Sequence, residues 1–177
     1  VAFRTAAAAL TDSFENPALR VAALRVVAGS HTLAAQPVER RLILLVAMHI
    51  GDPCSELHSA AMETLFNLGQ GDVAGLLMQH LGGDEVGART ALRALAHLGE
   101  AALPALQWVI GIASVRSRWP RARKYAIMAL AALAPLSRED LAPAEQVLKR
   151  VASDDRSPFL RDLARDAISK LQGAKAV

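Results

Sequence analysis

A short apolar pattern recurs five times along the chain and constrains its fold more than any other feature. In each copy an alanine is followed four positions later by an aliphatic residue, and in four copies the next position is also apolar. The alanines are Ala23, Ala61, Ala91, Ala126 and Ala164, at spacings of 38, 30, 35 and 38 residues. Positions one, four and seven beyond each alanine share one face of an α-helix. The pattern therefore predicts five copies of one helix with a buried face.

A second apolar stretch precedes each copy, so we predict helix pairs. The composition supports helices, because alanine and leucine dominate the apolar residues and only 4% of the chain is aromatic. The first helices are expected at about 2–12, 37–50, 72–82, 100–114 and 139–152, and the second helices at about 16–28, 55–68, 85–98, 120–134 and 157–172.

Proline, glycine and aspartate mark the ends of these helices. Prolines suit the first turn of a helix, where a backbone N–H is not needed, and we place Pro17, Pro120 and Pro158 there. Glycines favour a left-handed C-cap, and Gly69 and Gly99 follow second helices. Aspartates cap helix N-termini, and the turns within the pairs contain Asp12, Asp52, Asp84 and Asp154.

An arginine column completes the repeat. Three positions before the alanines stand Arg20, His58, Ala88, Arg123 and Arg161. A turn Asp followed by Leu/Val-Arg-x-x-Ala is similar to the short bacterial HEAT-like repeats, which are armadillo-like, and the chain resembles that family over nearly its full length. The resemblance implies an all-α fold: a right-handed α-solenoid of about five HEAT-like helix pairs, or about ten helices, with the second helices on the concave face. Pair four departs from the pattern because its turn has no Asp.

The two ends of the predicted array differ. The last helix alternates Arg161, Asp162, Arg165 and Asp166 around a narrow apolar stripe, as a capping helix should. The first helix, within "AFRTAAAAL", has few polar residues. We expect an upstream segment or a second copy of the chain to cover it, so self-association through this helix is a hypothesis. We predict one repeat domain over 1–177 and leave open that it is a fragment of a longer chain, because the sequence begins at Val1 without methionine.

Several functions have no sequence support. The longest wholly apolar run, Leu42 to Met48, is far below the roughly 20 residues of a membrane span. No two histidines are four apart and Cys54 is alone, so we predict no metal and no cofactor. "GQGDVAG" at 69–75 is interpreted as a turn between pairs, since a phosphate loop needs a preceding strand. We identify no catalytic residues, and we expect a cytoplasmic protein.

The segment "ASVRSRWPRARK" at 113–124 has five positive charges and no acid, while the whole chain has a net charge of +3. We interpret the structural Arg column of Arg20, Arg123 and Arg161 as pairing with turn aspartates, and so set Arg123 aside. Cations at a helix N-terminus oppose the helix dipole and so invite an anion. That anion could be a phosphate, a nucleic-acid backbone, an acidic partner loop or an acid of an adjacent pair. The residues predicted to meet it are Arg116, Arg118, Trp119, Arg121 and Lys124.

The second helices also present a surface of mixed charge. The residues that we expect to face the groove are Arg25, Glu63, Asn67, Arg93, His97, Met128, Ala132, Asp166 and Lys170. A nucleic-acid groove should be consistently basic, so mixed charges favour a protein or peptide partner. Of these residues we select Arg93, His97 and Met128 as candidate partner-binding residues.

We therefore predict a non-enzymatic scaffold or adaptor that binds a protein or peptide with an acidic feature. Two alternatives stay open. Some HEAT-like solenoids are DNA glycosylases for alkylated bases, which use aromatic side chains and an acid in a basic groove; here Trp108 falls on a first helix with no evident acidic partner. The other alternative is an accessory lyase or maturation factor, as in other short HEAT-like proteins, which no residue identifies.

Overall fold

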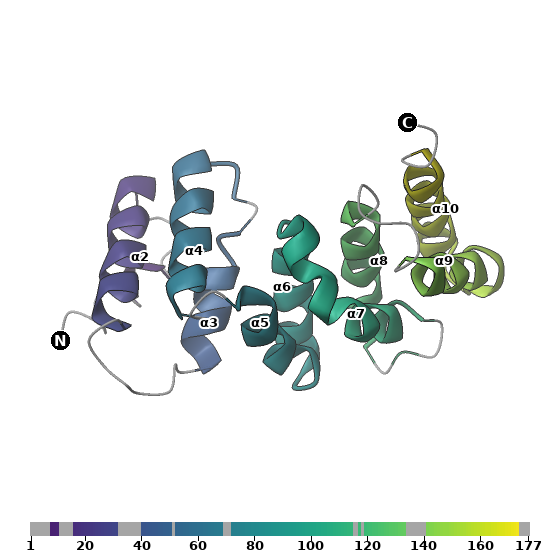
Figure 1. Cartoon of the computed structure of the whole chain (residues 1–177), viewed down its shortest axis with the longest axis horizontal. Helices are drawn as coiled ribbons and strands as arrows, with labels where there is room; N and C mark the ends of the chain where they lie inside the picture. Colours follow the sequence, from purple (N-terminus) through teal and green to yellow (C-terminus); the bar gives the residue numbers. More distant parts are fainter. Residues whose placement is uncertain are drawn as a thin grey trace. The chain divides into compact units, whose positions relative to one another are not determined.

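The computed structural model describes residues 8–10, 16–31, 40–50, 52–68, 72–114, 117, 119–133 and 141–173. These residues form helices and turns with no strand among them, so the predicted all-α class is confirmed (Figure 1). The helices are α2 (Pro17–His31), α3 (Arg40–Ala47), α4 (Ser55–Leu68), α5 (Val73–Leu81), α6 (Glu85–Leu95), the 3-10 helix η1 (Gly99–Ala105), α7 (Leu106–Ala113), α8 (Arg123–Ala132), α9 (Ala142–Asp154) and α10 (Pro158–Gly173). The predicted first helix at 2–12 lies mostly outside the described residues.

The chain divides into two compact units, Val1–Leu77 and Met78–Val177, with the boundary inside α5. We describe each unit by itself, and the single repeat domain over 1–177 stays a prediction. No helix in the described ranges is both long enough and apolar enough to cross a bilayer.

In the N-terminal unit, α4 packs against both α2 and α3. Thr64, buried in α4, connects two of these helices. Its hydroxyl lies 3.2 Å from the carbonyl oxygen of Leu24 in α2 and 2.7 Å from that of Ala60 in its own helix. A buried hydroxyl needs such partners, so Thr64 links α4 to α2 at one register.

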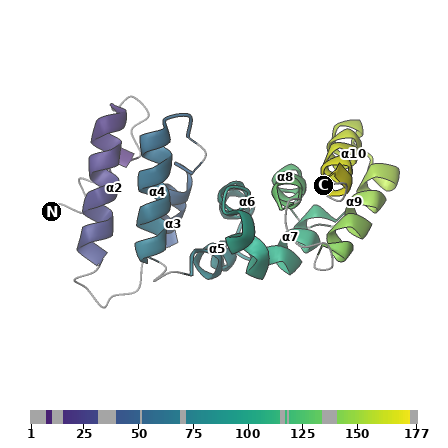
Figure 2. The same ribbon diagram turned by 45° about the horizontal axis from the view of Figure 1, so that its top comes forward.

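In the C-terminal unit the helices form two rows. The second helices α6, α8 and α10 pack side by side, and α7 packs against α9 in the other row. The rows are joined by the contacts of α7 with α8 and of α9 with α10. Figure 2 shows these two rows.

The repeated alanines are all buried. Each is at most 6% exposed, and four of the five are completely buried. Four residues further on, Val27, Leu65, Leu95 and Leu130 are also buried, whereas Ile168 in the last copy is half-buried. The predicted buried face is therefore confirmed, and it is less complete in α10.

Two of the three predicted helix-starting prolines are confirmed, since α2 begins at Pro17 and α10 at Pro158. Pro120 is a wrong prediction. It lies in a turn closed by a hydrogen bond from the N–H of Ala122 to the carbonyl of Trp119, and α8 begins only at Arg123. The helix predicted over 100–114 begins instead as the 3-10 helix η1 with Pro104 inside it. Proline disfavours α-helix in the residue before it and has no N–H to donate.

Gly99 has the left-handed backbone expected after a second helix, with φ of 54°. Gly69 lies outside the described residues. We expected His97 on the same second helix as Arg93. His97 lies instead in the turn between α6 and η1, because α6 ends at Leu95.

One aspartate caps a helix as predicted: Asp84, the N-cap of α6, accepts from the N–H of Gly87 at 2.8 Å. Asp52 accepts instead from the N–H of Cys54 at 2.9 Å, in the turn before α4. Asp154 is a wrong prediction, since it is the exposed last residue of α9. Its neighbour Asp155 is the turn residue instead and accepts from the N–H of Ser157 at 2.9 Å. Asp12 lies outside the described residues.

Pair four has a substitute for its missing aspartate. The Ser117 hydroxyl accepts from the N–H of Trp119 at 3.1 Å, two residues on, as Asp52 and Asp155 do in their turns. Each of these three residues stands nine positions before a repeated alanine. That spacing is a signal in the sequence that would have selected Asp155 over Asp154.

Candidate binding sites

An acidic side chain from the adjacent helix pair contacts the basic segment at 113–124. Arg116 and Arg118 lie outside the described residues. Arg121 is exposed and precedes α8, and its backbone N–H donates to Oε1 of Glu85 at 2.6 Å. Glu85 belongs to the first turn of α6. The sequence suggested four kinds of anion for this turn. One of them, an acidic side chain of an adjacent helix pair, is therefore already present.

Lys124 and Trp119 also contact their own chain. The Lys124 ammonium is 4.8 Å from the centroid of the Tyr125 ring, within the range of a cation–π interaction. Lys124 is half-buried at the first turn of α8, as is Trp119 in the preceding turn. The described part of the basic segment is thus a half-buried turn with one exposed cation, Arg121, and not a uniformly exposed patch.

The structural Arg column leads to a buried ion pair. Nη2 of Arg123 in α8 bonds to Oδ2 of Asp155 in the α9–α10 turn, and the two residues are 8% and 3% exposed. Nη1 of Arg161 donates to the backbone carbonyl of Asp155 at 2.7 Å. Two arginines of the column therefore meet at one aspartate of the fifth helix pair.

The environment of Asp155 favours its charged form. Burial acts to raise the pKa of this carboxyl, but the hydrogen bonds from Arg123 and from the Ser157 N–H, with the charges of Arg123 and Arg161, outweigh burial and hold the pKa below its ordinary value. The carboxylate is thus ionised at neutral pH and balances the buried Arg123 charge.

The charge of Arg20, the third arginine of the column, lowers the pKa of a buried histidine, His49. Nε2 of His49 lies 3.3 Å from the carbonyl of Leu10, and His49 is 7% exposed. Burial has the largest effect and lowers the pKa of His49, and the charge of Arg20 lowers it further. The hydrogen bond to Leu10 and the charge of Asp52 raise it, but they do not outweigh burial. The net lowering of its pKa favours the neutral form of His49 in the folded N-terminal unit.

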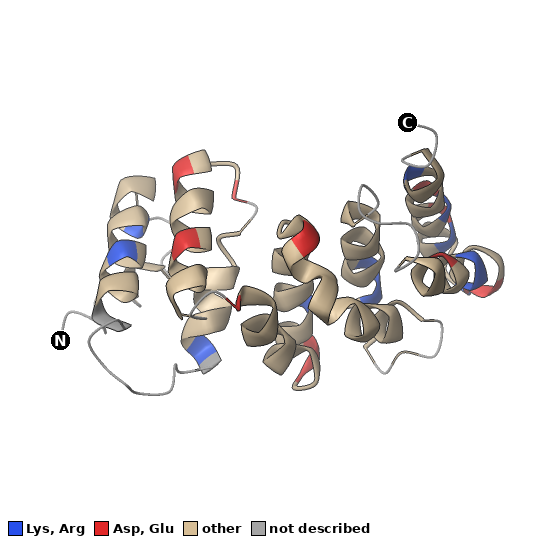
Figure 3. Ribbon diagram, in the orientation of Figure 1, with Lys and Arg blue, Asp and Glu red and all other residues tan. Residues whose placement is uncertain are grey.

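Two adjoining cavities form a groove between α2 and α4, which we call the α2–α4 groove. The first, of about 490 Å³, is lined by Ala18, Val21, Ala22, Arg25, Ser55, Glu56, Ser59, Ala60 and Glu63. The second, of about 290 Å³, is lined by Arg25, Ala28, Gly29, Glu63, Thr64 and Asn67. Arg25 and Glu63 line both cavities, so the two cavities are neighbours. Figure 3 shows basic segments on α2 and acidic segments on α4.

The remaining residues expected to face the groove are in the C-terminal unit. Arg93 on α6, Met128 on α8, and Asp166 and Lys170 on α10 are exposed, as is His97 in its turn, and Ala132 is half-buried. These helices form the row of second helices described above.

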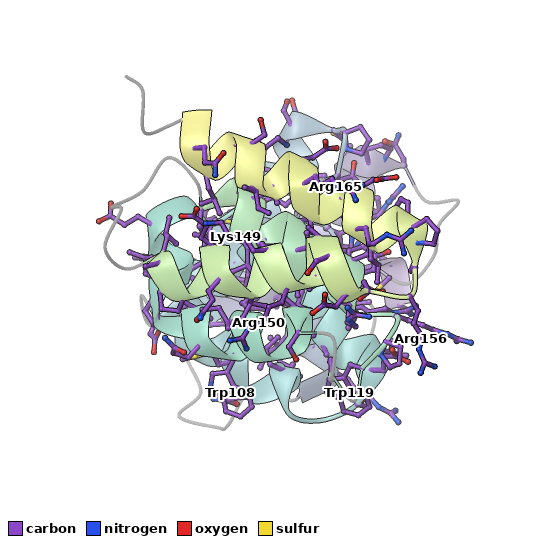
Figure 4. The ribbon with its side chains drawn as sticks, turned by 90° about the vertical axis from the view of Figure 1, so that its right-hand side faces the viewer. Trp108, Trp119, Lys149, Arg150, Arg156 and Arg165 are labelled. Atoms are coloured by element: carbon purple, nitrogen blue, oxygen red, sulfur yellow. The ribbon has the colours of Figure 1, made fainter. Side chains whose placement is uncertain are left out.

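A site that the sequence analysis missed lies beside the basic turn. A cavity of about 680 Å³, which we call the Trp groove, is lined by Leu81, Gln107, Trp108, Gly111, Ile112, Ser117 and Trp119. Trp108 is 51% exposed, and its ring lies close to Gly82, where an added Cβ would be 3.5 Å from the ring. Both tryptophans project to the same lower edge in Figure 4. The signal in the sequence for this site is the scarcity of tryptophan, since the chain has only two.

The described residues contain no cluster of three or more His, Cys, Asp or Glu that could hold a metal ion. In the part of the chain that the structure describes, the Trp groove has no acidic or basic residue in its lining.

Comparison with known proteins gives information on the fold alone. No protein-family model matches the chain, and no curated protein matches it. The chain is similar in structure to an engineered protein whose crystal structure comes from the Northeast Structural Genomics Consortium. The TM-score is 0.52 at 15% sequence identity, and the match covers 97% of this chain and 80% of that one. The likeness supports the all-helical architecture.

Proposed function

We propose that the protein is a non-enzymatic interaction scaffold that binds a protein or peptide in the α2–α4 groove. One observation carries this proposal: Arg25 and Glu63, selected from the repeat as groove-facing, are exposed and line both cavities of the groove. Small residues such as Ala22 and Ser59 also line the first cavity, which leaves room for a partner backbone to approach.

The charges of the groove favour a polypeptide over a nucleic acid. Arg25 on α2 stands with Glu56 and Glu63 on α4, so the groove has both signs and more acid than base. A nucleic-acid backbone would meet two carboxylates instead of a series of cations. A peptide with both acidic and basic side chains complements this arrangement.

We further propose that the helix pairs belong to a right-handed α-solenoid of the HEAT-like type, with the second helices forming its concave face. The buried alanine column supports this proposal, as do the two rows of helices in the C-terminal unit. The basic turn would add a contact for an acidic residue of the partner at Arg121. Glu85 already accepts a hydrogen bond from the Arg121 N–H, so the partner would compete with it.

Selection from a random peptide library tests the scaffold proposal. The full chain is used as bait, and enriched peptides are synthesised and titrated against wild type, Arg25→Glu and the matched control Arg150→Glu. Arg150 is equally an exposed helix arginine, but it lies on α9 outside the groove. We expect a class of peptides with both charges whose affinity falls about tenfold or more with Arg25→Glu and stays within about twofold with Arg150→Glu.

Two results would reject the proposal. Every enriched peptide binding Arg25→Glu as tightly as wild type would remove the α2–α4 groove as a site. Binding of a short DNA duplex with a steep salt dependence, together with no enriched peptide, would favour the nucleic-acid class instead.

A further inference from the structure

The row formed by α6, α8 and α10 exposes one residue of each helix at the same position of the repeat (Figure 2). These residues stand two positions after the repeated alanines: Arg93 on α6, Met128 on α8 and Asp166 on α10. All three are exposed, and Met128 is 46% exposed although it is a large apolar residue. The row therefore presents a base, an apolar side chain and an acid on three adjacent helices.

Two contacts at the helix starts fix the register of this row. The N–H of Arg121, just before α8, donates to Glu85 in the first turn of α6. Arg123, the first residue of α8, pairs with Asp155, which stands just before α10. Because the three helices start side by side and pack together, they run in the same direction. Residues at the same repeat position therefore lie at similar heights along them.

The charges at the two edges of the row are too far apart to pair with each other. Packed helices have axes about 8–10 Å apart, so about 16–20 Å separates the axis of α6 from that of α10. An ion pair needs its nitrogen and oxygen within about 4 Å, and α8 lies between Arg93 and Asp166. Neither residue takes part in the ion pairs found within the described residues. Both charges are therefore available to a ligand that crosses the three helices.

Other charges on the same face follow this polarity. Four residues earlier, about one turn, stand Arg89 on α6, Lys124 on α8 and Asp162 on α10. The positive charges are again towards α6 and the negative charge is on α10. Asp162 is balanced by its ion pair with Arg165, and Lys170 lies in the last turn of α10, where the helix dipole stabilises a cation. Asp166 is therefore the acid that a ligand meets at this edge.

A complementary ligand has an acid, an apolar side chain and a base at intervals of about 8–10 Å. An extended peptide without internal hydrogen bonds has about three residues per turn and rises about 3.1 Å per residue, so every third side chain returns to one face about 9 Å further on. The pattern acid–x–x–apolar–x–x–base therefore matches the three helices. A nucleic acid would bring phosphates towards Asp166, and a peptide with only one sign of charge would meet a like charge at one edge.

We propose that the row of α6, α8 and α10 binds an extended segment of a partner protein with the pattern acid–x–x–apolar–x–x–base. The acid of the segment pairs with Arg93, the apolar side chain packs on Met128, and the base pairs with Asp166. This site lies in the C-terminal unit and involves no residue of the α2–α4 groove. It therefore goes beyond the scaffold proposal, and either site can fail without the other.

Four seven-residue peptides with blocked termini test this pattern by two-dimensional NMR of the isotopically labelled full chain. Three have leucine at the centre, glycine or serine between, and end residues that are glutamate and arginine, two glutamates or two arginines. The fourth has the composition of the first, but its glutamate and arginine are adjacent. We expect the first peptide to bind most tightly and to shift the amides of Arg93, Met128 and Asp166.

Three results would overturn the proposal. The first is equal affinity for the first and fourth peptides, since the spacing of the charges would then have no effect. The second is tighter binding of a ten-residue oligothymidylate than of any peptide. The third is a fall in peptide affinity as the concentration of the chain rises, which would indicate that a second copy of the chain occupies this face.

Charge reversals at the two edges should change which peptide binds, with folding checked by circular dichroism. Arg93→Glu should weaken binding of the first peptide about fivefold and favour the peptide with two arginines. Asp166→Arg should weaken it similarly and favour the peptide with two glutamates. The double variant Arg93→Glu/Asp166→Arg again has one base and one acid, so it should bind the first peptide, in the opposite direction, within about twofold of wild type.

The matched control is Arg150→Glu, which reverses an exposed arginine on α9, in the other row of helices. It should change the affinity for every peptide less than twofold. An unchanged order of peptide affinities in both single variants would refute the site.

Discussion

The buried ion pair between Arg123 and Asp155 leads to the sharpest stability prediction. Removing the carboxylate with Asp155→Ala leaves the guanidinium of Arg123, 8% exposed, without its counter-ion. It also removes the acceptor for the Ser157 N–H at the start of α10. Breaking a buried pair on one side costs about 3–5 kcal/mol, because the remaining charge is left buried and uncompensated. We expect Asp155→Ala to lower the free energy of unfolding of the C-terminal unit by this amount.

The chain contains a matched control for this substitution. Asp162 pairs with Arg165 three residues on, but both side chains are exposed, so Asp162→Ala should cost at most about 1 kcal/mol. A second comparison separates charge from packing. The double variant Arg123→Met/Asp155→Leu removes both charges, and we expect it to recover most of the stability lost in Asp155→Ala.

Urea unfolding followed by tryptophan fluorescence measures these differences in the relevant unit, because Trp108 and Trp119 both belong to residues 78–177. The lowered pKa of Asp155 sets the pH dependence. Its stabilisation is present above the ordinary carboxyl pKa of 3.8 and is lost as pH falls below it. This loss should be smaller in Asp155→Asn. The reasoning would be refuted if Asp155→Ala cost no more than Asp162→Ala at pH 7.

Three further predictions concern other contacts. The lowered pKa of His49 means that folding favours its neutral form, so the N-terminal unit should lose stability as pH falls below about 6.5. Hydrogen exchange in α3 should show this loss in wild type but not in His49→Leu. Thr64→Val removes the hydroxyl that reaches Leu24, and should cost about 1 kcal/mol in thermal unfolding monitored by circular dichroism. Glu85→Ala removes the acid beside Arg121, and should strengthen binding of a hexaglutamate peptide about threefold by anisotropy; unchanged or weaker binding would show that the turn takes no acidic partner.

The sequence predicted the helices well because burial repeats with the helical period. Ala61, Ala91, Ala126 and Ala164 recur in the same place in the repeat and are all completely buried, so their column was visible without knowledge of the fold. Turns lack such a period. Asp154 and Asp155 are adjacent and chemically identical, and only the spacing to Ala164 distinguishes them.

Contacts between distant segments could not be predicted in the same way. Glu85 reaches the N–H of Arg121 across 36 residues, because α6 and α8 pack side by side. The Trp groove requires Trp108 on α7 and Trp119 in the following turn to face one cavity. Both arrangements depend on how helices pack and turn, which composition and spacing do not specify.

Mapping a bound peptide by two-dimensional NMR tests the scaffold proposal most directly. The isotopically labelled full chain is titrated with an enriched peptide that has both charges. We expect the largest amide shifts along the α2–α4 groove, at residues such as Arg25, Ser59 and Glu63. Shifts confined to helices outside this groove, or no shifts at saturating peptide, would contradict the proposal that the groove is where this protein binds its partner.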